Sequence, residues 1–228
     1  MSIQIETRGD VTWLTIDDGK ANALSNELVA DLGAALTELA GNTKALVIAG
    51  RPGRFCAGYD LKVMMAGKEA ASALTAAGCR VMAQLYTFPA PVVMACTGHA
   101  MAGGALLLLC GDVRIGVEGA FKIGLNEVQI GIPLPQFGID LVTDRLDPRA
   151  VTRATMGAHA FNPTTAAEAG FLDHTTSADA LLETVHAEAE RLAQLETVPY
   201  ALTKRGLRQS LADKMVAEVD ANLAELLG

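Results

Sequence analysis

Short apolar runs alternate with longer stretches of helical periodicity along the chain. Residues 11–17 have the period of two that indicates a strand, with apolar side chains on both faces. The runs 45–50 and 91–98 are almost wholly apolar, which is typical of buried strands, and residues 112–116 resemble a further strand. Because strands alternate with helices, the pattern predicts an α/β core with parallel pairing.

Helical periodicity fills the intervals between these strands. Ser25 is expected to cap a helix along which Leu28, Leu32, Leu36 and Leu39 recur at helical spacing. Further helices are expected at residues 68–88, from a glycine pair at 103–104 as far as Gly111, and at 148–157 and 164–169.

The C-terminal third of the chain is expected to be helical only. From Ala178 to the end one amphipathic pattern continues, and its apolar face is marked by Leu181, Val185, Ala189, Leu192 and Leu195. With no internal repeat or linker, we predict a single α/β domain, with residues 1–177 as its core and 178–228 as a helical oligomerisation region. An intrachain contact would use the same apolar face.

Composition excludes several classes of protein. Half of the 228 residues are hydrophobic but only 4% are aromatic, so small aliphatic side chains must fill the core. The net charge of −8 argues against a nucleic-acid partner, although a local basic patch could still bind an anionic ligand. No signal segment or membrane span is evident, which favours a cytoplasmic protein without a membrane partner. The four cysteines and four histidines lack metal-ligand spacing, so no metal is expected.

Two glycine-containing loops follow predicted strands. In FCAGYDLK, Gly58 lets the backbone approach a ligand closely, so that the amide of Tyr59 could point into a cavity. In HAMAGGALLLL, Gly103 and Gly104 begin a helix whose first amides lack partners within the helix. One amide from each loop would form an oxyanion hole if the strands are neighbours. A glycine pair at a helix start can also serve packing alone.

One carboxylate lies in an otherwise apolar stretch, IGLNEVQIGIPLPQFG, which spans residues 123–138. Glu127 is its only charged residue. It lies either at a turn that faces outward or in a pocket where its charge has a chemical role. Burial against Ile130 and Ile132 would raise the pKa of this carboxyl and make it a stronger base.

Several segments together, in their order and spacing, resemble the crotonase (enoyl-CoA hydratase/isomerase) superfamily. These segments are NALS, FCAGYDLK, GHAMAGG, CGDVRI, NEVQIGI, AAEAGFLD and LTKRGLR. The resemblance implies a ββα superhelix with a helical C-terminal region that helps to form a homo-oligomer, either a trimer or a dimer of trimers. It also implies an acyl-CoA substrate, and no cofactor beyond the coenzyme A that the substrate carries.

The resemblance also assigns roles to particular residues. The amides of Tyr59 and Gly103 would bind the thioester oxygen, on which negative charge develops when a neighbouring proton is removed. Glu127 would be the catalytic acid/base. His99 could reach the thioester, or it could be a hydrogen-bonded structural residue. The other substrate-binding positions would be Lys20, Ala21, Ala23, Leu24, Ala57, Asp60, Leu61, Lys62 and Gly104. Lys62 and either Arg51 or Arg54 could meet the CoA phosphates, or be solvated loop charges.

Departures from the family pattern bear on the reaction. Enoyl-CoA hydratases of this family use two glutamates, and Leu106 occupies the position of the first. One carboxylate suffices for a Δ3,Δ2-enoyl-CoA isomerase, which the segment IGLNE also resembles. The alternatives are an enoyl-CoA hydratase of fatty-acid β-oxidation and a crotonase-fold protein that binds acyl-CoA without turnover. Tyr59 is also bulkier than the residue usual at its position, which leaves the acyl-chain preference open.

Overall fold

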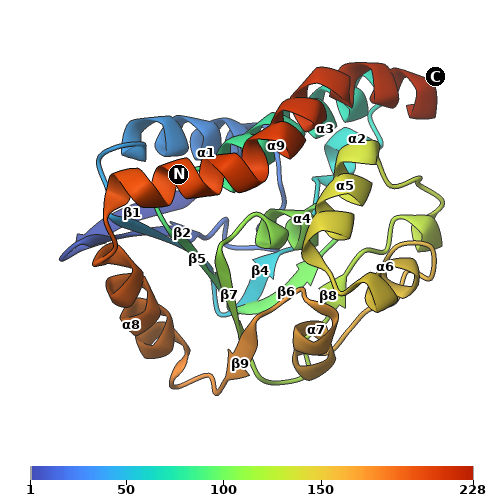
Figure 1. Ribbon diagram of the computed structural model, residues 1–228. Helices are drawn as coiled ribbons and strands as arrows, with labels where there is room; N and C mark the ends of the chain where they lie inside the picture. The colour runs from blue at the N-terminus through green and yellow to red at the C-terminus, as the bar shows by residue number, and fades with distance from the viewer. Residues whose placement is uncertain (1, 228) are drawn as a thin grey trace.

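A six-stranded sheet forms the frame of the molecule (Figure 1). The computed structural model describes residues 2–227. The sheet order is β1 (Ile3–Arg8), β2 (Val11–Ile16), β3 (Ala45–Gly50), β5 (Val92–Cys96), β7 (Val113–Val117) and β9 (His174–Thr176). Strand β1 is antiparallel to β2, and every later pairing in this sheet is parallel. The parallel α/β core predicted from the apolar runs is therefore confirmed.

A second, three-stranded parallel sheet follows from the ends of the first. Its strands are β4 (Gly53–Cys56), β6 (Gly98–Met101) and β8 (Ile123–Gly124), in that order. Strand β4 begins three residues after β3 ends, and β6 begins two residues after β5 ends. The chain therefore passes from one sheet to the other and then into a helix, and this ββα order recurs. Because β4 and β6 are short and partly polar, the sequence pattern did not reveal them.

Helices cover both faces of the larger sheet. On one face lie α1 (Asn26–Leu39), α3 (Lys68–Tyr86) and the long α9 (Thr197–Leu227), which packs along α3 (Figure 1). On the other face α8 (Leu181–Ala193) packs against β3 and β5. Side chains of these strands alternate between the two layers: Leu46 and Ile48 face the first, and Val47 faces α8.

Shorter helices surround the end of the second sheet. They are α2 (Leu61–Met64), α4 (Gly103–Leu109), the 3₁₀ turn η1 (Val128–Ile130), α5 (Gln136–Arg145), α6 (Pro148–Ala154) and α7 (Pro163–Ala169). Two predicted helix starts are confirmed: the Ser25 side chain caps α1 by accepting from the Leu28 amide at 3.2 Å, and α4 begins at Gly103. In the described residues 2–227, no helix is both long and apolar enough to cross a membrane.

The helical region predicted after Ala178 is confirmed, but the C-terminal third differs from the prediction in two details. Strand β9 lies within it and extends the larger sheet beside β7. The single amphipathic pattern after Ala178 is also divided into α8 and α9, and Leu195, assigned to its apolar face, lies between the two helices and is 46% exposed. A three-residue polar strand carries no detectable period of two, so only pairing with β7 defines it.

Helix α9 is held to its own chain by apolar contacts and by buried charges. Met215 and Leu223 are buried against α3 and α5. Near the start of α9, Lys204 Nζ lies 2.6 Å from Asp112 Oδ2, and an Arg208 guanidinium nitrogen lies 2.7 Å from Asp112 Oδ1. Breaking such a buried pair is strongly destabilising. These contacts fix the direction of α9, whose far end reaches the cavity described next.

Candidate active site

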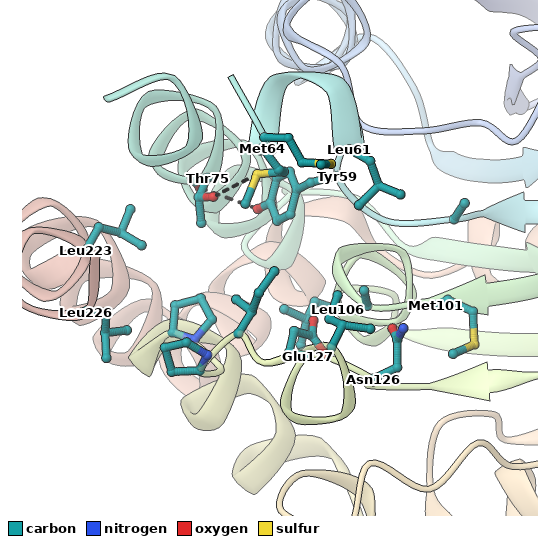
Figure 2. Close-up of a pocket in the computed structure, with 17 residues that line it drawn as sticks. Tyr59, Leu61, Met64, Thr75, Met101, Leu106, Asn126, Glu127, Leu223 and Leu226 are labelled. Atoms are coloured by element: carbon teal, nitrogen blue, oxygen red, sulfur yellow. Dashed lines mark hydrogen bonds between the residues drawn. The ribbon is translucent and has the colours of Figure 1, made fainter. Parts of the chain in front are cut away.

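A cavity of about 530 Å³ lies where four segments meet. Its wall is formed by the loop after β4 with α2 and α3, by the end of β6 with α4, by residues 126–135, and by the end of α9. The side chains labelled in Figure 2 are Tyr59, Leu61, Met64, Thr75, Met101, Leu106, Asn126, Glu127, Leu223 and Leu226. Most of this lining is apolar, as is usual for a site that encloses a small organic molecule.

The loop after β4 is held against the segment before α1 by backbone hydrogen bonds. The Leu24 amide donates to Gly58 O at 2.8 Å, and the Asp60 amide donates to Leu24 O at 3.1 Å. In such a parallel bridge, Leu24 exchanges its bonds with residues 58 and 60, so the amide of Tyr59 faces the other way. The Ala57 amide also donates to Ala21 O.

The two glycine loops are in direct contact. A Cβ added at Gly58 would lie 2.9 Å from Met101 O and 3.2 Å from the Gly103 nitrogen, and Gly58 has a φ of +94°. Only glycine therefore fits at this point of closest approach. A Cβ at Gly104 would lie 2.2 Å from Cys56 O. Strands β4 and β6, which precede these loops, are neighbours in the second sheet. An oxyanion hole built from one amide of each loop requires this arrangement.

The first amides of α4 are free at this junction. The Ala105 and Leu106 amides both donate to Ala102 O, whereas no backbone group in residues 2–227 accepts from the amides of Gly103 or Tyr59. Ala102, at the N-cap, has a positive φ of +51°, which is unfavourable for a residue with a Cβ. Strain of this kind next to two unpaired amides is typical of a functional site.

Glu127 lies beside the same cavity, in the turn that follows β8. Its backbone carbonyl accepts from the Ile130 and Ile132 amides, which fixes the turn. Its Oε2 atom is buried and has no hydrogen-bond partner in the described part of the chain. Burial raises the pKa of the Glu127 carboxyl to about 7, although the amides of Glu127 and Asn126 partly offset this rise. The direction of this shift agrees with the sequence-based expectation.

Leu106 occupies the cavity wall where a second carboxylate would have to lie. It is 1% exposed and belongs to α4, one turn beyond the free amides. Among the described residues that line the cavity, Glu127 is the sole carboxylate. In Figure 2 these two side chains lie together on one side of the cavity, with Tyr59 and Thr75 on the opposite side.

The structure brings together part of the predicted substrate-binding set. Ala57 and Leu61 line the cavity, and Gly104 lies at the start of α4. The Asp60 carboxylate caps α2 by accepting from the Lys62 amide at 2.8 Å. These assignments to substrate binding stay predictions, as do Ala21, Ala23 and Leu24, which form the neighbouring segment.

His99 and the basic side chains lie outside the cavity lining. The His99 Nδ1 atom accepts from the Lys122 amide at 3.0 Å, and the ring packs edge-on against Phe121. Both contacts favour the structural alternative for this histidine. The Arg51 guanidinium group donates a hydrogen bond to Lys20 O, so Arg51 helps to order the segment that precedes α1.

Some lining residues could not be assigned from the sequence. Met64 and Thr75 reach the cavity from α2 and α3, and Leu223 and Leu226 reach it from the far end of α9. Each belongs to an ordinary apolar helical pattern, and only the tertiary fold places it here. The amphipathic pattern of α9 gave a weak signal for burial and none for a site.

Comparison with known proteins agrees with this geometry. Residues 6–226 match the family described as enoyl-CoA hydratase/isomerase. An enoyl-CoA hydratase/isomerase family protein from Pseudomonas syringae is 37% identical, with a TM-score of 0.96 and coverage of 99% of this chain and 98% of that one. A protein from Mycobacterium tuberculosis, described as an enoyl-CoA isomerase in one structure and as a probable enoyl-CoA hydratase in another, is 33% identical, with a TM-score of 0.92 and 98% coverage of both chains in the first.

Relatives by sequence include enzymes with a different reaction. A carnitinyl-CoA dehydratase from Proteus mirabilis is 28% identical over 206 residues, which cover 89% of this chain and 78% of that protein. The family match across nearly the whole chain and the shared ββα architecture together establish the classification. The chain belongs to the enoyl-CoA hydratase/isomerase family and has the crotonase fold.

Proposed function

We propose that the protein is a Δ3,Δ2-enoyl-CoA isomerase, which moves the double bond of a 3-enoyl-CoA thioester into conjugation with the carbonyl group. The observation that carries this proposal is the single carboxylate of the cavity, Glu127, which lies beside an apolar Leu106. Hydration of a double bond needs a group that holds and activates water as well as a proton donor. Isomerisation needs one group that removes a proton and returns it elsewhere.

In the proposed reaction, the ionised Glu127 removes a proton from C2 of the substrate. The electron pair of the broken C–H bond delocalises into the thioester, and negative charge develops on its oxygen. The amides of Tyr59 and Gly103 donate hydrogen bonds to that oxygen, which can lower the barrier by about 3 kcal/mol for each donor. The protonated Glu127 then delivers the proton to C4, and the double bond forms between C2 and C3.

The environment of Glu127 suits both halves of this cycle. A group with a pKa of about 7 is partly ionised at neutral pH, and after it takes up a proton it gives that proton back readily. The unpartnered Oε2 is an acceptor without a competing donor in residues 2–227. A substrate bound against the apolar lining would displace water, which strengthens the hydrogen bonds to the thioester oxygen.

Turnover of trans-3-hexenoyl-CoA by the wild type and a Glu127→Gln variant tests the proposal. We expect conversion to the conjugated 2-enoyl product by the wild type and a loss of about 10²-fold or more in the variant, because a positioned base contributes about that much. Glu183→Gln, an exposed carboxylate on α8, is the matched control and should retain activity.

Parallel assays with crotonyl-CoA separate the alternatives. Hydration of crotonyl-CoA without isomerisation of 3-hexenoyl-CoA would indicate that the protein is a hydratase. Several of its relatives are named as hydratases. Thermal stabilisation by acyl-CoA without turnover of either substrate would indicate a binding protein. Subunit number stays a prediction, which analytical ultracentrifugation of the purified protein would decide.

A further inference from the structure

The Tyr59 ring is enclosed between glycines of two different helices. A Cβ added at Gly78 in α3 would lie 2.6 Å from Tyr59 Cε1, closer than real Cβ atoms approach other atoms. A Cβ added at Gly103 in α4 would lie 2.9 Å from both Cδ2 and Cε2 of the same ring. Glycine weakens a helix interior, so a buried glycine within the 19-residue helix α3 indicates a packing requirement. The Tyr59 ring occupies the space that a side chain at residue 78 would need.

The enclosed ring has little freedom to move away from a ligand. Its hydroxyl group points to α3 and lies 3.4 Å from Thr75 O, and burial raises the pKa of this phenol well above its usual range. Figure 2 shows the ring on the side of the cavity opposite Glu127 and Leu106. An acyl chain with its carbonyl at the Tyr59 and Gly103 amides must therefore pass between a fixed aromatic wall and the catalytic carboxylate.

We infer that Tyr59 determines substrate specificity, in addition to its backbone role. Its ring, fixed by Gly78 and Gly103, limits the width of the channel beside the first carbons of the acyl group. Straight-chain substrates fit this channel, and substrates that branch near the reacting carbons are excluded. The inference rests on the proposed isomerase function, because that function places the reacting carbons beside the ring.

Two isomeric substrates test the width of the channel. Both trans-3-hexenoyl-CoA and 4-methyl-3-pentenoyl-CoA have six acyl carbons, and only the second branches at C4. Removing the ring in Tyr59→Ala should shift the kcat/KM ratio toward the branched substrate by about 10-fold or more, the usual effect of one methyl group in an apolar pocket. Tyr59→Phe should keep the wild-type ratio, because it retains the ring. Comparing variants cancels the intrinsic difference in reactivity between the substrates.

Gly78→Ala tests the enclosure at a residue that does not itself line the cavity. The added methyl group must displace the ring, so kcat/KM for both substrates should fall in the wild-type background. In the Tyr59→Ala background the same substitution should have no such effect, because the atom it displaces is gone. Gly206→Ala in α9 is the control: its added Cβ would meet no atom within 4 Å, and we expect unchanged kinetics.

Binding measurements keep this inference separate from the isomerase proposal. Titration calorimetry with saturated hexanoyl-CoA and 4-methylpentanoyl-CoA reports the same width without any turnover. A preference for the straight chain that Tyr59→Ala abolishes would support the inference even if no substrate is isomerised. An unchanged preference in a folded Tyr59→Ala variant, or wild-type kinetics and binding in Gly78→Ala, would overturn it.

Discussion

Replacement of Glu127 by glutamine should change how the stability of the protein depends on pH. The folded carboxyl has a pKa of about 7 against an ordinary value of 4.5, because the cavity desolvates its charge. From about pH 4.5 to about pH 7 the folded state therefore binds more protons at this site than the unfolded state does. The free energy of unfolding must fall as pH rises through that window.

The size of the effect follows from the shift itself. Each pKa unit corresponds to about 1.4 kcal/mol, so ionisation of Glu127 destabilises the fold by at most about 3.5 kcal/mol well above pH 7. Between about pH 5 and about pH 8 the expected change is about 2.5 kcal/mol. The glutamine variant does not titrate and lacks this dependence. Its amide, however, places a donor at the unpartnered Oε2 position, which costs about 1–3 kcal/mol at every pH.

Urea unfolding of both proteins at about pH 5 and about pH 8 separates these two contributions. The constant cost cancels in the comparison, so the variant should gain about 2.5 kcal/mol relative to the wild type between the two pH values. Exposed Glu183→Gln on α8 should show no such gain. A difference between Glu127→Gln and the wild type that does not depend on pH would show that the carboxyl titrates as if exposed, and the argument for a tuned base would fail.

Four further predictions concern the reaction and the frame around it. The kcat/KM for 3-hexenoyl-CoA should rise with pH and level off above about pH 7, since the base must be ionised; a flat profile down to pH 5 would contradict this. Leu106→Glu supplies the second carboxylate and should introduce hydration of crotonyl-CoA, measured by loss of enoyl absorbance; a folded variant without hydration would count against the one-carboxylate argument. Gly104→Ala sets a Cβ 2.2 Å from a backbone oxygen of β4, so kcat should fall by about 10-fold or more while Gly206→Ala stays unaffected. Lys204→Met leaves Asp112 with one of its two buried cationic partners and should lower the free energy of unfolding by about 3 kcal/mol, measured in urea; a loss below about 1 kcal/mol would mean that the pair does not anchor α9.

The sequence pattern predicted those parts of the fold in which local physics and tertiary structure agree. The runs at 45–50 and 91–98 are apolar because β3 and β5 are covered on both faces, and such burial leaves a direct trace in composition. Strands β4, β8 and β9 are short and exist because a neighbour pairs with them. No local period could reveal these strands.

In the candidate site, too, some residues can be recognised from the sequence and others only from the tertiary structure. Gly58 and the glycines at the start of α4 attract attention because glycine lets two backbones approach closely, and their loops do meet. By contrast, Gly78 looks like a defect in a helix until the Tyr59 ring is seen against it, 19 residues away in the sequence. Leu223 likewise reads as an ordinary buried residue of α9, although it lines the cavity.

The apolar run around Glu127 follows from what a single base requires. A hydrogen-bond donor beside Oε2 would stabilise the ionised form, whereas Leu106 and the unpartnered Oε2 leave the carboxylate poorly solvated. Poor solvation raises the pKa to about 7 and destabilises the folded protein in the same measure. Apolar burial of α9 and the Asp112 ion pairs near the start of that helix contribute stability elsewhere in the fold. A variant that stabilises the ionised form of Glu127 should therefore gain stability at the expense of turnover.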